Sequence, residues 1–162
     1  MKQSFTAALL AVFAGAVMPT VVSAAEAMAS GTFTEEQFER GQVLYERECA
    51  SCHGVNLEGQ VGWRDTKVDG MRLAPPHDKS GHTWHHPDEL LYKLTKYGFE
   101  AMIGSEYKVS MPIYDGLLKD EDIIAALSYI KSTWPDDVRQ IHDKINADYK
   151  LNNAMENSKS GS

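Results

Sequence analysis

Cysteine is scarce in this chain: its 162 residues include two, Cys49 and Cys52. Small exported scaffolds that depend on disulfides need several paired cysteines, so the chain does not belong to that class. A bridge between these two residues would close a loop too short to restrict the unfolded chain much. The pair therefore indicates a different use for its thiols.

Basic residues are outnumbered. Lysine and arginine total 16 against 23 aspartates and glutamates, and the formal net charge is −7. Nonspecific nucleic-acid binding relies on basic surfaces, so nucleic acid is not an expected partner. Hydrophobic residues make up 43% and charged residues 24%, as in ordinary globular proteins, and the length suits one domain.

Long apolar runs are also lacking, apart from one at the N-terminus. Residues 1–24 contain Lys2, then a stretch rich in alanine, valine and leucine, and finally small residues. This pattern predicts a secretory signal peptide that is cleaved after Ala24 or Ala25. A retained anchor is the alternative, but Pro19 interrupts the run, and a membrane span needs about 20 apolar residues. We therefore expect an exported, soluble periplasmic protein without stable membrane insertion.

Composition divides the rest of the chain into three parts. We predict a short linker at 25–33, a folded domain at 34–150 and a disordered tail at 151–162, where polar residues dominate. No segment alternates between polar and apolar residues with the period of a strand, so no substantial sheet is expected.

Helical patterns recur within the predicted domain. We expect helices from about residue 35 into the cysteine pair, from about 87 to 97, at 120–134 and at 135–150. Thr34 and Gln37 form a capping box at the start of the first helix. The segments between the helices hold most of the glycines and are predicted to be long irregular loops. The predicted fold class is all-α, with three to four helices.

The two cysteines stand in the run CASCH, with His53 directly after Cys52. In a CxxCH run the thiols add across the two vinyl groups of a haem, and the histidine becomes the proximal ligand of the iron. The spacing suits this chemistry because one helical turn can bring all three side chains to one edge of a porphyrin. The motif predicts one covalent haem c, anchored by Cys49 and Cys52, with His53 bound to its iron.

Three other uses of the cysteine pair stay open. A thioredoxin-like redox pair would need a βαβ context, which the patterns do not show. A structural disulfide is the simplest alternative. A zinc site would need a second group of ligands. The only other histidine cluster in the sequence comprises His77, His82, His85 and His86.

Two segments, GQVLYERECASCHG and SMPIYDGLLKDEDIIAALSYIKSTW, resemble class I mono-haem cytochromes c of the bacterial, exported kind. The resemblance covers about Thr34 to Trp134 and is less specific in the middle. It implies the small cytochrome c fold, in which helices and long irregular loops wrap around one haem. It also implies a close crossing of the first and last helices of that fold, at Gly41, Tyr45 and Tyr129.

The resemblance further implies His/Met ligation of the iron, in which a thioether raises the reduction potential. Met111 matches the family's ligand because Pro112 follows it and holds the preceding residue extended. Met102 is the second candidate. The rival is bis-histidine ligation by a histidine of the loop GHTWHHPDELL, namely His82, His85 or His86.

Two supporting roles also follow from the resemblance. In the family, the carbonyl of a proline accepts a hydrogen bond from the proximal histidine, and Pro75 or Pro76 is placed to do so. The usual G-P pair of the family is absent at this point. Family members also bind a haem propionate with a tryptophan or tyrosine, and Trp63 and Trp84 are candidates.

The function that these features favour is electron transfer, not enzymatic catalysis. We expect a monomeric periplasmic carrier that shuttles single electrons in a respiratory chain. Its partners would be a redox donor and acceptor, such as a terminal oxidase, a reductase or a dehydrogenase. One alternative is a haem sensor or enzyme with a displaceable sixth ligand. Another is the electron-entry module of a larger redox complex, with helix 135–150 as a docking element.

Overall fold

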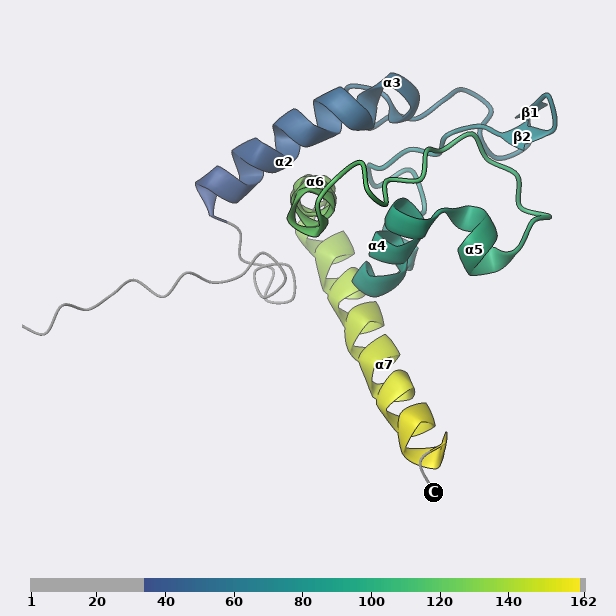
Figure 1. Cartoon of the computed structure of the whole chain (residues 1–162). Coiled ribbons are helices and arrows are strands. Elements are labelled where there is room, and N and C mark those ends of the chain that lie inside the picture. The colour runs from purple at the N-terminus through teal and green to yellow at the C-terminus, as the bar shows by residue number, and fades with distance from the viewer. Residues whose placement is uncertain (1–33, 161–162) are drawn as a thin grey trace, which may run out of the picture.

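The computed structural model describes residues 34–160, so the predicted signal peptide (1–24) and linker (25–33) lie outside the described residues. The described part is mostly helical, which confirms the predicted fold class. Its helices are α2 (Glu35–Glu48), α3 (Ala50–His53), the 3-10 turn η1 (Thr83–His85), α4 (Asp88–Tyr97), α5 (Phe99–Ile103), α6 (Asp120–Ser132) and α7 (Asp136–Ser160) (Figure 1). Within residues 34–160, no helix is long and apolar enough to cross a membrane.

The start of α2 follows directly from local sequence. Gln37 donates its backbone N–H to the Thr34 hydroxyl (3.2 Å), and the Gln37 side chain accepts from the Thr34 N–H (3.0 Å). This is the predicted capping box, and it satisfies two backbone donors that the first turn leaves free. The helix therefore enters the domain in a defined register.

The long segment between α3 and η1 contains a small hairpin that the sequence patterns did not predict. Strand β1 (Lys67–Val68) pairs in antiparallel fashion with β2 (Met71–Arg72). Two-residue strands are too short to show the alternation by which strands are recognised. Arg72 also donates its N–H to the Lys108 carbonyl (2.9 Å), which joins this hairpin to the segment that precedes Met111.

Helices α2 and α6 cross closely, and Figure 1 shows α6 nearly end-on beneath α2. The crossing point is Gly41: a Cβ atom there would lie 2.3 Å from the Ala125 carbonyl oxygen and 2.9 Å from the Tyr129 Cβ. One turn later, the Tyr45 and Tyr129 rings pack with their centroids 5.5 Å apart. The three residues expected at a helix crossing therefore meet there.

The main apolar core is formed where the end of α2 and the segment before α6 pack against α6 and the start of α7. Its buried members are Tyr45, Ala50, Leu57, Tyr114, Ile123, Leu127, Ile130, Trp134 and Val138. This core contains the face of α6 that its apolar periodicity predicts.

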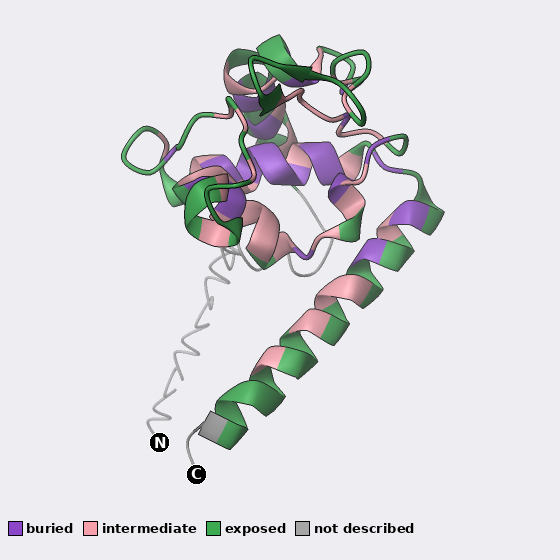
Figure 2. Cartoon of the chain, turned by 90° about the vertical axis from the view of Figure 1, so that its right-hand side faces the viewer, coloured by how far each residue is buried: buried purple, intermediate pink, exposed green. Residues whose placement is uncertain are grey.

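Helix α7 packs with its first half against the rest of the domain and then projects away from it (Figures 1 and 2). Val138 and His142 are buried, whereas residues 154–159 are exposed. The helix runs to Ser160, so residues 151–160 are helical, where a disordered tail was expected. The segment lacks glycine and proline before Gly161, so nothing in it stops a helix that has already begun.

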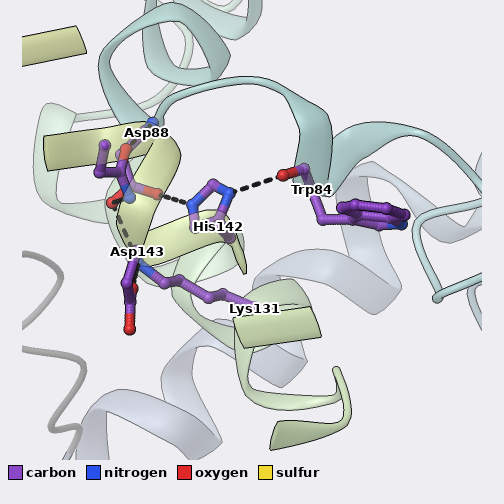
Figure 3. A network of polar contacts seen from close by, with 6 residues as sticks. Trp84, Asp88, Lys131, His142 and Asp143 are labelled. Atoms are coloured by element: carbon purple, nitrogen blue, oxygen red, sulfur yellow. Dashed lines mark hydrogen bonds and ion pairs between the residues drawn. The ribbon is translucent and has the colours of Figure 1, made fainter. Parts of the chain in front are cut away.

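A polar network holds α7 to the start of α4 (Figure 3). His142 is fully buried; its Nδ1 lies 3.0 Å from the Trp84 carbonyl oxygen and its Nε2 lies 2.8 Å from Asp88 Oδ1. Both ring nitrogens of His142 are thus within hydrogen-bonding distance of an oxygen that accepts. The pair of contacts joins α7 to η1 and α4 at once.

Asp88 is the centre of this network. Its carboxylate also accepts from Lys131 Nζ (3.0 Å) and Asn146 Nδ2 (2.9 Å), and its backbone N–H donates to Asn146 Oδ1 (2.7 Å). Lys131 reaches the exposed Asp143 as well, at 3.5 Å. Charges that are mostly removed from water are tolerated only when they are paired in this way.

Substitution of Gly41 tests the crossing. We expect Gly41→Ala to lower the free energy of unfolding by about 1–3 kcal/mol, because the new methyl group must push α2 and α6 apart. This loss should exceed the gain of about 1 kcal/mol in helix propensity. Urea unfolding of the full chain measures it. Val43→Ala, on the exposed side of the same helix, is the control and should change the free energy by less than about 0.5 kcal/mol. Equal stability of the two variants would contradict a close crossing.

Acid should weaken the attachment of α7. Burial alone would raise the pKa of Asp88, but the His142 hydrogen bond and the Lys131 charge outweigh it, so the pKa is lowered. A carboxylate with a lowered folded-state pKa contributes stability above its unfolded pKa of about 4, and that contribution is lost as the pH falls through the folded value.

We expect Asp88→Asn to lower the free energy of unfolding at pH 7 by about 1–3 kcal/mol, since it leaves buried donors poorly satisfied. Urea titrations at several pH values should show the difference from the unmodified chain shrinking towards pH 3. Asp143→Asn makes the same chemical change at an exposed site and should cost less than about 1 kcal/mol. A pH-independent loss in Asp88→Asn would rule out the ionic role.

Candidate functional site

The cysteine motif occupies a single turn at the junction of α2 and α3. Cys49 caps the end of α2 by donating its N–H to the Tyr45 carbonyl (2.9 Å), and His53 donates its N–H to the Cys49 carbonyl (2.9 Å). Cys52 is exposed and Cys49 is partly buried, and the two are not joined in a disulfide. The backbone therefore presents two thiols and an imidazole from one helical turn, as the spacing predicts.

The Cys49 thiol does not have the character of a redox-active cysteine. Burial, with the nearby Glu48 and Cys52, raises the pKa of Cys49 to about 11. Redox-active cysteines work as thiolates and have lowered pKa values. Within residues 34–160, no group of three or more histidine, cysteine and acidic side chains is placed to hold a metal ion.

His53 is held in the state that a metal ligand needs. Its Nδ1 lies 2.8 Å from the Pro75 carbonyl oxygen, which can only accept, so Nδ1 carries the hydrogen. Burial lowers the pKa of His53, and the Pro75 hydrogen bond only partly opposes this. A neutral ring with hydrogen on Nδ1 has its lone pair on Nε2. Of the two prolines considered, Pro75 is the one that makes the contact.

The loop after α3 is folded so that Pro75 returns to His53. Gly59 donates its N–H to the His53 carbonyl (2.7 Å) and adopts a φ of 68°. A Cβ atom at this glycine would lie 2.4 Å from the Pro76 nitrogen, so the chain can pass itself this closely only at glycine. Gln60 also accepts the N–H of Ala74 (2.8 Å) through its side chain. The irregular loop is thus a defined structure that positions one carbonyl.

Met111 lies on the same apolar cluster as Cys49, although 62 positions separate them in the chain. Among the methionines within residues 34–160, Met71 and Met155 are 40% and 47% exposed, and Met102 lies on α5 outside this cluster. The sequence alone had left Met102 as the second candidate. The packing favours Met111.

A direct hydrogen bond ties the Met111 segment to the cysteine motif. Tyr114 is buried, and its hydroxyl donates to the carbonyl of Glu48, the residue before Cys49, at 2.8 Å. The backbone N–H groups of Tyr114 and Asp115 donate to carbonyls of α4, at Thr95 (3.3 Å) and Lys96 (2.9 Å). The methionine segment is therefore anchored on both α2 and α4.

Two histidines of the loop GHTWHHPDELL, considered as rival iron ligands, pack against tryptophan rings. The His82 ring stacks on Trp63 (centroids 5.1 Å apart), and the His85 ring lies against Trp84 (3.7 Å). The Trp84 indole N–H donates to the Lys79 carbonyl (3.3 Å), so the donor that was considered for a propionate already has a partner. Trp63 borders a cavity of about 180 Å³ whose polar lining includes Arg64, Arg72, His82 and Tyr107.

His77 was named from the sequence only as a member of the histidine cluster, and the structure places it beside His53. Its ring stacks face to face on the His53 ring, with centroids 3.9 Å apart and planes 20° apart. The two residues are separated by the whole Gly-rich loop, and no periodicity relates them. The sequence signals for His77 were its place in the histidine cluster and its position directly after the proline pair, and neither relates it to His53.

These residues fit a covalent haem. The site offers two unpaired thiols, a neutral imidazole with Nε2 available, and a thioether packed on the cluster that also contains Cys49. The surrounding side chains are mainly apolar and aromatic, as a large flat apolar group requires. The fit to a haem rests on the chemistry of the thiols, the imidazole and the thioether that the fold brings together.

Comparisons with known proteins agree with this reading of the site. The chain is 29% identical over 97 residues to "Cytochrome c2 iso-2" of Magnetospirillum molischianum, covering 52% of this chain and 89% of that protein. It is 28% identical over 93 residues to "Cytochrome c2 iso-2" of Magnetospirillum fulvum, covering 52% of this chain and 90% of that protein. A comparison with solved structures found no significant match.

The profile of one protein family, described as "Cytochrome c", matches residues 38–134, which is more than half of the chain. That region begins inside α2 and ends two residues before α7, so it contains the cysteine motif, the proline pair and Met111. By its sequence, its mostly helical fold and the donors gathered at the end of α2, the chain belongs to the cytochrome c family.

Proposed function

We propose that this protein is an electron carrier that holds one haem c through thioether bonds to Cys49 and Cys52, with His53 Nε2 and Met111 Sδ as the axial ligands. The bound haem supplies an iron centre that cycles between the ferrous and ferric states. The observation that carries the proposal is the His53 ring, whose Nδ1 is engaged by Pro75 and whose Nε2 is left available. Membership of the cytochrome c family supports it.

The protein's own residues provide three things in this scheme. The thiols of Cys49 and Cys52 fix the cofactor covalently. The Pro75 carbonyl keeps hydrogen on Nδ1 of His53, which orients the ring and raises its basicity as a ligand. The apolar core cluster would exclude water from a haem held by these residues, and the nature of that shell would help to set the reduction potential.

The anchoring of the methionine segment favours a carrier over a sensor. A sensor needs a sixth ligand that can be displaced, whereas the hydrogen bonds of Tyr114 and Asp115 hold this segment to α2 and α4. With His53 and Met111 both bound to the iron, no position for a substrate would be left open. Electron transfer, which needs none, is then the activity that the site supports.

For the carboxylates of the haem we propose the cavity bordered by Trp63. Arg64 and Arg72 offer guanidinium groups that can pair with carboxylates in a forked geometry. Trp63, whose ring carries the stacked His82, forms one wall. Trp84 is the weaker candidate because its N–H is used within the loop.

We propose that the protein works as a periplasmic monomer in a respiratory chain, after cleavage of residues 1–24. Its donor and acceptor would be redox proteins such as a dehydrogenase, a reductase or a terminal oxidase. Contacts between such partners are small and transient. The full sequence has a net charge of −7, and removal of Lys2 with residues 1–24 makes it −7 − 1 = −8. This charge suits partners with basic docking surfaces, because opposite charges speed encounter.

Covalent attachment can be tested by removing the thiols. On a denaturing gel, the protein purified from the periplasm of a host that attaches haem c should carry haem with the polypeptide. Cys49→Ser/Cys52→Ser should lose this haem, because no thioether can form. Ser51→Ala, between the two cysteines, should keep it. Haem retained by the double variant on the gel would contradict the proposed anchoring.

Ligation by Met111 can be tested by spectroscopy. The oxidised protein should show the weak methionine–iron band at the red end of the visible spectrum, and Met111→Ala should lose it and lower the reduction potential. In its reduced form this variant should bind carbon monoxide, which the unmodified protein should not do readily. Met102→Leu is the matched control and should keep the band. Loss of the band in Met102→Leu but not in Met111→Ala would reverse the assignment, and carbon monoxide binding by the unmodified protein would favour a sensor.

A further inference from the structure

His77 packs flat against the imidazole of His53. With the ring centroids 3.9 Å apart and the planes 20° apart, His77 hinders rotation of the His53 ring out of its plane. The contact between His53 and Pro75 acts in the plane of the ring, whereas His77 acts on its face. The two contacts therefore restrict different motions of the same side chain.

The His77 ring is itself held in place. Its Nδ1 lies 2.8 Å from the Thr83 hydroxyl oxygen. Thr83 is buried and donates its hydroxyl hydrogen to the Pro76 carbonyl (3.4 Å), so its oxygen accepts from His77. A ring with this bond cannot swing away from His53 without breaking it.

The backbone of His77 is fixed as well. Its N–H donates to the Leu57 carbonyl (2.8 Å), and its carbonyl accepts from the Trp134 indole N–H (2.7 Å). Trp134 is buried and packs edge-on against His142, the α7 residue at the centre of Figure 3, with ring centroids 4.9 Å apart. The His77 backbone is thus held by the loop after α3 and by Trp134, which in turn contacts α7.

We propose that His77 is a positioning residue that fixes the plane of the His53 imidazole at the haem iron. The proposal rests on the proposed function, in which His53 is an axial ligand. The plane of an axial imidazole decides how its π orbitals overlap with the iron d orbitals. A single fixed plane gives one low-spin ferric species, and a ring free to take several planes gives a mixture. Stacking of this kind is worth about 0.5–1.5 kcal/mol, enough to favour one orientation about two- to tenfold.

The test is electron paramagnetic resonance of the frozen ferric holoprotein, together with a redox titration. The unmodified protein should give one sharp low-spin signal. His77→Ala should give a broadened or doubled signal with shifted g values, because the face of His53 is uncovered. His77→Phe restores a flat ring but cannot bond to Thr83, so its signal should be narrower than that of His77→Ala and similar to that of Thr83→Val. Thr83→Val keeps the His77 ring but removes its hydrogen-bond acceptor, and it should broaden the signal.

His85→Ala is the matched control, since this exposed histidine lies in the same loop and should leave the signal unchanged. A purely structural role would lower the thermal stability of His77→Ala while leaving its g values and potential as in the unmodified protein; that result overturns the proposal. If His77→Ala does not mature with haem, Thr83→Val decides, and an unchanged signal there also overturns it.

The design separates this inference from the proposed function. If the unmodified protein carries no covalent haem, the proposed function fails and the role of His77 fails with it. If the unmodified protein shows the methionine–iron band and Met111→Ala loses it, the proposed ligation stands whatever His77→Ala does. The resonance signals of the His77 and Thr83 variants then test the positioning role alone.

Discussion

The rest of the structure depends on the close approach of α2 and α6 at Gly41. Because this residue has no side chain, the α2 backbone can lie against the Ala125 carbonyl, and Tyr45 then packs on Tyr129 one turn later. The Tyr45 hydroxyl donates to the Gly54 carbonyl (2.8 Å), directly behind α3. The crossing thereby places the end of α2, and the thiols and imidazole on it, against the core.

The rest of the site consists of segments that are distant in sequence and pack against the end of α2. The loop after α3 brings the Pro75 carbonyl to His53, and the segment before α6 brings Met111 to the same core cluster as Cys49. Each of these segments is held by a hydrogen bond to a backbone carbonyl, such as the bond from the Tyr114 hydroxyl to Glu48. A buried backbone carbonyl needs a partner, so these bonds are costly to break and make the geometry specific.

Helix α7 lies beyond the region that matches the family, yet it is part of the fold. The network around Asp88 joins it to α4 and η1, and Trp134 links that network to the proximal side of the site. Helix α7 can thus support the site around His53 although it supplies none of the proposed iron ligands. Residues 154–159, towards the outer end of the helix, are exposed (Figure 2).

Local sequence determined the elements that depend on near neighbours. The capping box at Thr34, the CxxCH turn and the apolar stripe of α6 were predictable because each is completed within one or two helical turns. The sequence also limited the candidates for two distant roles: two prolines for the hydrogen bond to His53, and a few methionines for the second iron ligand. Tertiary structure decided the rest: which proline reaches His53, that His77 covers its face, and that α7 continues to Ser160 and docks through a buried imidazole. These contacts join residues between 22 and 58 positions apart in the chain. The path of an irregular loop is set by close packing against the folded core. Sequence periodicity does not predict that path, because it reports only on contacts between near neighbours in a helix or strand.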